Sequence, residues 1–166
     1  MTISHKDPKL PSPPDIPEGP EWTEALTVLT PEIGETLVAV VRTLCPHDAL
    51  AERVYHRVVL HYDRLARTAP AAAASIKQAV DALNDAMTLP FRDRSESYRV
   101  AALRAIETTT AFVFLQRTAV RFLYDDIEVW EAFGYEGASV HLGGYIARGF
   151  NDLDWLPEPP VGDSAA

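Results

Sequence analysis

Histidines and carboxylates are the side chains of this sequence that could carry out acid–base or metal chemistry. His56 and His61 lie five residues apart within a stretch of helical periodicity, so they are separated by about 140° around the helix axis. Glu52 lies four residues before His56 and could contact it, but the Glu-x-x-His spacing of di-iron helical bundles is absent from the sequence. The pattern favours structural or surface histidines. A metal-assisted site that uses His56, His61 and C-terminal carboxylates is the alternative.

Two acidic stretches invite comparison with the magnesium-binding aspartate clusters of terpene synthases. They are Asp125-Asp126-Ile127-Glu128 and Asn151-Asp152-Leu153-Asp154. The first has Val129 where a further carboxylate belongs, and the second has Trp155 where a hydroxyl belongs. Helix caps and surface ion pairs explain these carboxylates more simply. We therefore predict no metal ion at either stretch.

Candidate nucleophiles and phosphate loops also lack their usual context. Ser139 and His141 occur without the G-x-S-x-G turn that presents a catalytic serine. Cys45 ends a predicted helix, where the helix dipole disfavours a thiolate, so we predict a buried apolar side chain. Gly143-Gly144 lacks the lysine and glycine spacing of a phosphate loop, and no dinucleotide fingerprint is present. The sequence predicts a chain that is no enzyme on its own and binds no flavin.

The charge balance excludes several classes of partner. The formal net charge is −9, from 24 acidic and 15 basic residues. A nucleic-acid or anionic-lipid surface would instead require a basic patch. The sequence contains no run of about 18 apolar residues, so it predicts no membrane span. Residues 1–14 contain neither the apolar core of a secretory signal nor the arginine pair of a twin-arginine signal. We therefore expect a cytoplasmic protein.

The first 28 residues are predicted to form a proline-rich extended arm, because proline fixes φ and removes backbone donors. Prolines occupy positions 8, 11, 13, 14, 17 and 20. The arm is interpreted either as a tail without a binding role or as a polyproline segment that wraps a partner, with Ile16 and Trp22 as its anchors.

Residues 29–134 are predicted to form the helical part of the chain. Thr30-Pro31-Glu32 is a helix start, with threonine as cap and proline at the first position, and Pro46 ends this helix. Further helices are expected from about Asp48 to Pro70, from Ala71 to Met87 and from about Ser95 to Tyr124. Asp126 is expected to cap a short helix that ends at Gly134. The predicted fold class is all-α, an antiparallel bundle of about four main helices with an irregular C-terminal wrap.

Residues 135–166 are predicted to form that wrap, an irregular acidic tail. Glycines at 137, 143, 144 and 149 lie close to Tyr135, Tyr145 and Phe150 in the sequence, and Arg148 is the single Lys or Arg after Arg121. Aromatic residues and arginine are the usual anchors of protein interfaces. The predicted partner interface comprises Trp22, Tyr135, His141, Tyr145, Arg148, Phe150 and Trp155. The alternative is that the aromatic residues fold back as a lid over the helices.

The order of these features resembles the small-subunit family known as gluconate 2-dehydrogenase subunit 3. The resemblance is carried by Leu29-Thr30-Pro31-Glu32, by Leu44-Cys45-Pro46-His47-Asp48, by Phe122-Leu123-Tyr124-Asp125-Asp126, by Gly134-Tyr135-Glu136-Gly137 and by Gly143-Gly144. This sequence departs from the family's pattern in two ways. The family's usual export signal is missing, and Tyr145 stands in place of the asparagine that commonly follows the glycine pair. The resemblance implies a helical, non-catalytic partner of a large FAD-dependent dehydrogenase of the glucose–methanol–choline class. The flavin would be bound by the large chain. Besides a stand-alone helical-bundle enzyme with a metal-assisted site, a free-standing regulatory interaction module is the alternative function.

Overall fold

The computed structural model describes residues 15–85, 88–135, 137, 143 and 144, and every regular element in these residues is a helix. This confirms the predicted all-α class over the described part of the chain. The chain divides into two units, Met1–Tyr135 and Glu136–Ala166, and the helices all belong to the first unit. They are η1 (Pro20–Ala25), α1 (Pro31–Leu44), α2 (Glu52–Thr68), α3 (Pro70–Asp85), η2 (Phe91–Asp93), α4 (Glu96–Ile106), α5 (Thr110–Leu123) and α6 (Ile127–Phe133).

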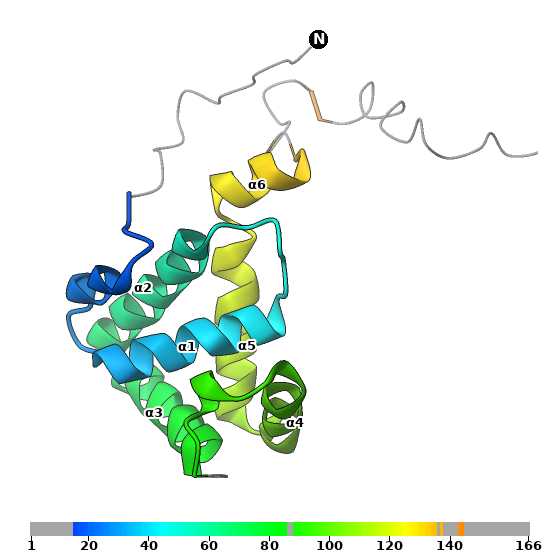
Figure 1. The fold of residues 1–166 in the computed structure, drawn as a ribbon. Coiled ribbons are helices and arrows are strands. Elements are labelled where there is room, and N and C mark those ends of the chain that lie inside the picture. The colour runs from blue at the N-terminus through cyan, green and yellow to red at the C-terminus, as the bar shows by residue number, and fades with distance from the viewer. Residues whose placement is uncertain (1–14, 86–87, 136, 138–142, 145–166) are drawn as a thin grey trace, which may run out of the picture. The chain divides into compact units, whose positions relative to one another are not determined.

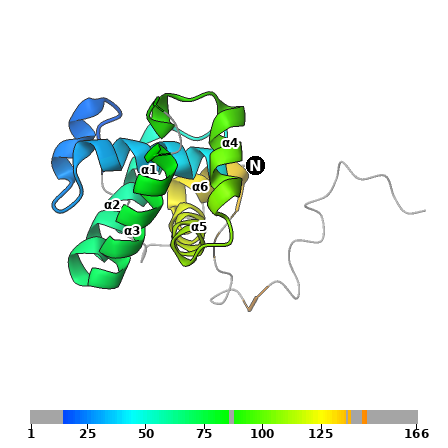
Figure 2. The same cartoon turned by 90° about the horizontal axis from the view of Figure 1, so that it is seen from below.

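Helices α2, α3 and α5 pack against one another, and α1 crosses α5 at a steep angle in both views (Figures 1 and 2). Contacts between α2 and α5 show that these two helices are antiparallel. Arg57, in the first half of α2, bonds to Asp126 just after α5, whereas Tyr62, further along α2, bonds to Leu115, which lies earlier in α5. Helix α1 contacts both α2 and α5, and its Leu37, Val40 and Val41 belong to the buried core.

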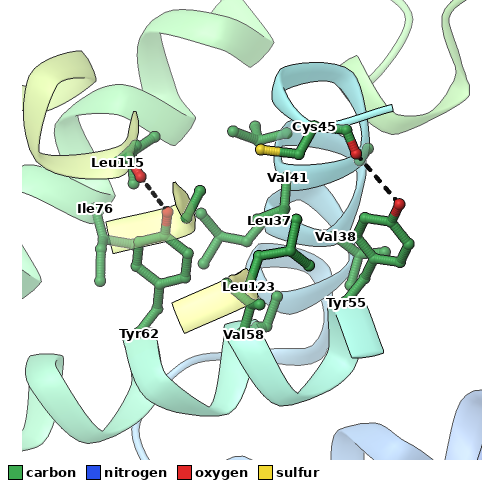
Figure 3. Packing of buried hydrophobic residues seen from close by; sticks show 14 of the residues in the cluster. Leu37, Val38, Val41, Cys45, Tyr55, Val58, Tyr62, Ile76, Leu115 and Leu123 are labelled. Atoms are coloured by element: carbon green, nitrogen blue, oxygen red, sulfur yellow. Dashed lines mark hydrogen bonds between the residues drawn. The ribbon is translucent and has the colours of Figure 1, made fainter. Parts of the chain in front are cut away.

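The core between these helices is aliphatic, with two buried tyrosines that satisfy their hydroxyls on backbone carbonyls (Figure 3). The Tyr62 hydroxyl donates to the Leu115 carbonyl, and the Tyr55 hydroxyl donates to the Cys45 carbonyl at 3.2 Å. Burial raises the pKa of both phenols, so both remain neutral donors. Cys45 itself is buried, as predicted from its place at the helix end.

The start of α1 follows the predicted capping pattern. The Thr30 side chain accepts a bond from the Ile33 N–H, and Pro31 occupies the first helical position. Gly34 in the next turn allows a close approach, because an added Cβ would lie 2.7 Å from Leu26 and 3.1 Å from the Trp22 ring. Local capping and this close contact together fix where α1 meets the preceding segment.

The prediction of one helix from about Ser95 to Tyr124 is wrong, because the chain forms α4 and α5 with a break at residues 107–109. Thr109 has an extended backbone, with φ −79° and ψ 148°, and its hydroxyl accepts from the Phe112 N–H at 3.1 Å. The same hydroxyl donates to the Ile106 carbonyl at the end of α4. The side chain of Thr109 thus ends one helix and caps the next.

Substitution of Thr109 by alanine is expected to lower the free energy of unfolding by about 1 kcal/mol, the usual loss for a threonine cap. Substitution of the exposed neighbour Thr108 by alanine is the matched control, and it should change the unfolding free energy by less than about 0.5 kcal/mol. Urea unfolding followed by circular dichroism measures both values. Equal effects of the two substitutions would contradict the capping role.

Residues 15–28, which the sequence assigned to the extended arm, instead run along α2 and are partly buried. Ile16 and Trp22 are 6% and 4% exposed, and the Trp22 ring stacks on His56 at 4.5 Å. The buried Asp63 carboxylate accepts bonds from the backbone N–H groups of residues 27–29 and from the Thr27 hydroxyl. We call residues 15–29 the strap. The residues of α2 that hold the strap, Arg53, His56 and Asp63, lie far from it in the sequence. No local sequence pattern therefore predicted this packing.

Candidate interaction surface

One end of the first unit carries a group of aromatic rings that its own core does not bury. Tyr124, Phe133 and Tyr135 are 42%, 49% and 49% exposed, and His47 and Trp130 are partly exposed. We call these five residues the aromatic surface. They come from the loop after α1, from the end of α5, from α6 and from the residue that follows its Gly134 cap, so their grouping depends on the tertiary fold.

The rings of the aromatic surface contact one another mainly edge to face. His47 Nε2 lies 2.7 Å from the Tyr124 hydroxyl, and the His47 and Phe133 ring centres are 5.0 Å apart. The Trp130 ring meets Tyr135 at 5.3 Å, and its Nε1 donates to the Tyr124 carbonyl at 2.6 Å. Edge-to-face contacts hold rings in place without covering all of their faces. The surface is therefore ordered and still offers apolar area to a partner.

Local sequence sets both ends of α6. The Asp126 side chain accepts from the Glu128 N–H at 2.9 Å as the cap, and Gly134 ends the helix with φ 72°. A Cβ at Gly134 would meet no atom within 4 Å, so the left-handed backbone, and not lack of space, requires glycine there. Both boundaries confirm the predictions from sequence. Gly134 turns the chain so that Tyr135 follows directly on the aromatic surface.

Two arginines of α2 fasten α6 to the rest of the unit. The buried Arg57 binds Asp126 through Nε at 2.6 Å and Nη2 at 3.0 Å, and Nη2 also binds Glu128 at 2.8 Å. The more exposed Arg53 binds Glu128 and also Glu18 of the strap at 2.7 Å. The strap, α2 and α6 are thus joined by one network of four ion pairs.

These contacts shift the pKa values of Arg57 and Glu128. Burial alone would lower the pKa of Arg57, but its bonds to Asp126 and Glu128 outweigh burial and raise it. For Glu128, burial would raise the pKa, and the two arginines together lower it. Arg57 and Glu128 therefore both stay charged over the whole neutral range.

The two α2 histidines are held in ring stacks. His56 lies between Trp22 and the Pro17 carbonyl, which its Nδ1 reaches at 3.1 Å, and burial lowers its pKa. His61 stacks on Phe122 at 3.9 Å, and burial together with the charge of Arg64 lowers its pKa to about 4. Both rings are neutral at pH 7, and each packs on a separate aromatic neighbour.

Within the described residues, no group of three or more potential metal ligands lies close together. Asp126 is a helix cap and ion-pair partner, and Glu52 pairs with Arg42 rather than with His56. Burial raises the pKa of the Cys45 thiol, so it is not an activated nucleophile. A shallow hollow on α4 is lined by Glu96, Ser97, Val100, Ala101 and Arg104, all from one helix. The second acidic stretch, residues 151–154, lies outside the described residues.

The structure separates the residues of the predicted interface. Trp22 is buried against α2, where its ring stacks on His56. It therefore forms part of the core and is not available to a partner. Tyr135 lies on the aromatic surface. The others, His141, Tyr145, Arg148, Phe150 and Trp155, lie outside the described residues. The interface predicted from the sequence does not include Tyr124 and His47, and the only local signal for these two residues is their position beside helix ends.

No helix in the described part of the chain is both long and apolar enough to cross a membrane. Comparison with protein-family models, with curated proteins and with solved structures gave no match for this chain.

Proposed function

We propose that this chain is a non-catalytic small subunit of a cytoplasmic flavin-dependent oxidoreductase, and that it binds and stabilises a large FAD-containing chain. The resemblance to gluconate 2-dehydrogenase subunit 3 supports the identity of the partner class. In this proposal the helices form the scaffold, and the Gly/aromatic-rich segment after Tyr135 wraps onto the partner. Substrate chemistry and FAD belong to the large chain.

The observation that carries the proposal is the aromatic surface. Exposed aromatic rings that are already ordered lose little conformational entropy when a partner covers them. Arg57 holds α6 to α2, so these rings and the start of the following segment share one rigid support. The predicted interface of residues 134–155 begins on this support, at Gly134 and Tyr135. The acidic side chains that flank this segment in the sequence favour a partner with basic groups around its binding surface.

The surface is tested by alanine substitutions in the full chain. Replacement of Tyr135, Tyr145, Arg148 or Trp155 is expected to weaken binding to the large chain by about 2 kcal/mol, or about 30-fold in Kd, wherever the residue is a hot spot. Tyr98 on α4 is 59% exposed and far in sequence from this segment, so Tyr98→Ala is the matched control and should leave Kd unchanged. Isothermal titration with the purified large chain measures each Kd.

A melting curve of each variant separates binding from folding. The variants are expected to melt within a few degrees of wild type, because the buried core of the described residues is built from positions 16 to 129. Variants that bind as tightly as wild type but melt much lower would show that the segment is an internal lid. The interface would then lie elsewhere.

A further inference from the structure

Four exposed arginines on α2 and α5 form no ion pair with a carboxylate in the described part of the chain. Arg64 and Arg67 lie on α2, and Arg117 and Arg121 lie on α5. Residues three or four apart are neighbours on a helix surface, so each pair projects from one side of its own helix. The two helices also contact each other. We call these four residues the arginine face.

No exposed carboxylate belongs to the stretches of sequence that carry the arginine face. Asp63 is the only acidic residue in positions 60–69, and it is buried and bound to the strap. Positions 110–124 contain no acidic residue, although the formal net charge of the whole chain is −9. Like charges at helical spacing repel one another. An anionic partner would therefore stabilise this face by pairing with its guanidinium groups.

The arginines of the two helices border one shared pair of rings. His61 of α2 and Phe122 of α5 stack with their ring centres 3.9 Å apart, and both side chains are partly exposed. The Arg121 guanidinium lies over the Phe122 ring, 5.3 Å from its centre. The pKa of His61 is lowered by burial first, then by the charge of Arg64 and by that of Arg121, so both arginines act on this ring. Arg64 and Arg121 thus approach the stacked rings from different helices.

The same side of α2 already binds carboxylates nearer the start of the helix. Arg53 and Arg57 precede Arg64 by eleven and seven residues, so all three lie within about 20° of one line along the helix. Arg57 binds Asp126 and Glu128, and Arg53 binds Glu128 as well. These two carboxylates are two residues apart at the start of α6. The chain itself therefore shows that this side of α2 binds a short segment with two neighbouring carboxylates.

We propose that the arginine face binds an acidic segment of a partner protein, which presents carboxylates to Arg64 and Arg121. Guanidinium groups pair with carboxylates through two parallel hydrogen bonds and keep their charge at neutral pH. A short acidic segment meets only the local positive charge of this face. A long polyanion such as a nucleic acid would also meet the net charge of −9. The inference goes beyond the proposed function, because it holds whether or not the partner contains flavin.

Fluorescence anisotropy with a defined acidic peptide tests the proposal. The probe is a short fluorescein-labelled peptide of alternating glutamate and serine, and it is titrated with the full chain at low ionic strength. We expect saturable binding that weakens about tenfold in the double variant Arg64→Gln/Arg121→Gln, because two ion pairs with the peptide are lost. Added salt is expected to weaken the binding by screening. The matching peptide of alternating glutamine and serine should not bind.

Arg104→Gln is the matched control for Arg121→Gln. Arg104 is also exposed and forms no ion pair with a described residue, but it lies on α4. Arg121→Gln is expected to raise the Kd of the glutamate peptide several-fold, and Arg104→Gln to leave it nearly unchanged. The proposal is wrong if the glutamate peptide does not bind, if the two single variants weaken its binding equally, or if a thymidine oligonucleotide of the same length binds more tightly than the peptide.

Discussion

Replacement of Arg57 by methionine is expected to lower the free energy of unfolding by about 3–5 kcal/mol. The guanidinium is 6% exposed and is the main partner of the equally buried Asp126. Removing one member of a buried ion pair leaves the other charged and without compensation, which is the costly case. The measurement is urea unfolding at neutral pH, with the slope of the transition checked against wild type.

Arg53→Met is the matched control for Arg57. Arg53 also binds Glu128, but its side chain is 38% exposed, so its loss should cost no more than about 1 kcal/mol. The double variant Arg57→Met/Asp126→Asn should recover part of the loss, because the orphaned carboxylate is gone and the asparagine still caps α6. Equal effects of Arg57→Met and Arg53→Met would contradict the account of how α6 is fastened.

Replacement of Asp63 by alanine is expected to cost about 3 kcal/mol or more. Its carboxylate accepts bonds from the Val28 and Leu29 N–H groups at 2.8 Å each, and from the Thr27 hydroxyl at 2.5 Å. These bonds are part-buried, and each donor that is left without an acceptor away from water costs about 1–3 kcal/mol. Asp81 is exposed and pairs only with Lys77 in the next turn, so Asp81→Ala should cost less than about 0.5 kcal/mol. Urea unfolding of both variants gives the comparison.

The contribution of Asp63 depends on pH in a defined direction. Burial would raise the pKa of this carboxyl, but the bonds from Leu29, Thr27 and Val28 outweigh burial and lower it below the usual value. The stabilisation is therefore complete above the unfolded pKa of about 4 and is lost as pH falls through the folded pKa. Wild type and Asp63→Ala should converge in stability on acidification. A difference that stays constant down to the acid transition would contradict this assignment.

Local signals in the sequence were sufficient for several boundaries. The start of α1 is set by Thr30 and Pro31, and the two ends of α6 are set by Asp126 and Gly134. These ends depend only on hydrogen bonds and φ values of neighbouring residues, and the structure confirms the three predicted positions. The break at Thr109 was missed because apolar residues continue on both sides of it. The cap there is a single hydroxyl, so the hydrophobic period alone predicted one helix.

Contacts between distant residues account for what the sequence could not predict. The strap is held by Asp63 and His56, which lie 34 to 39 residues further along the chain. Arg57 and Asp126 are 69 residues apart, so nothing local marks either as a buried charge. The aromatic surface likewise requires His47 and Phe133 to meet. Tyr135 is the one predicted interface residue found on it, and the predicted residues beyond position 140 remain predictions.

The most direct test of the central claim is the visible absorbance spectrum of the full chain, isolated by affinity tag from the cell that makes it. We expect the complex to contain a second, larger chain and to show the spectrum of bound flavin. When the two chains are separated without denaturation, flavin and dehydrogenase activity should stay with the large chain, and this chain should be colourless. Flavin or turnover that remains with this chain alone, or a tagged chain isolated without a flavin-containing partner, would contradict the account.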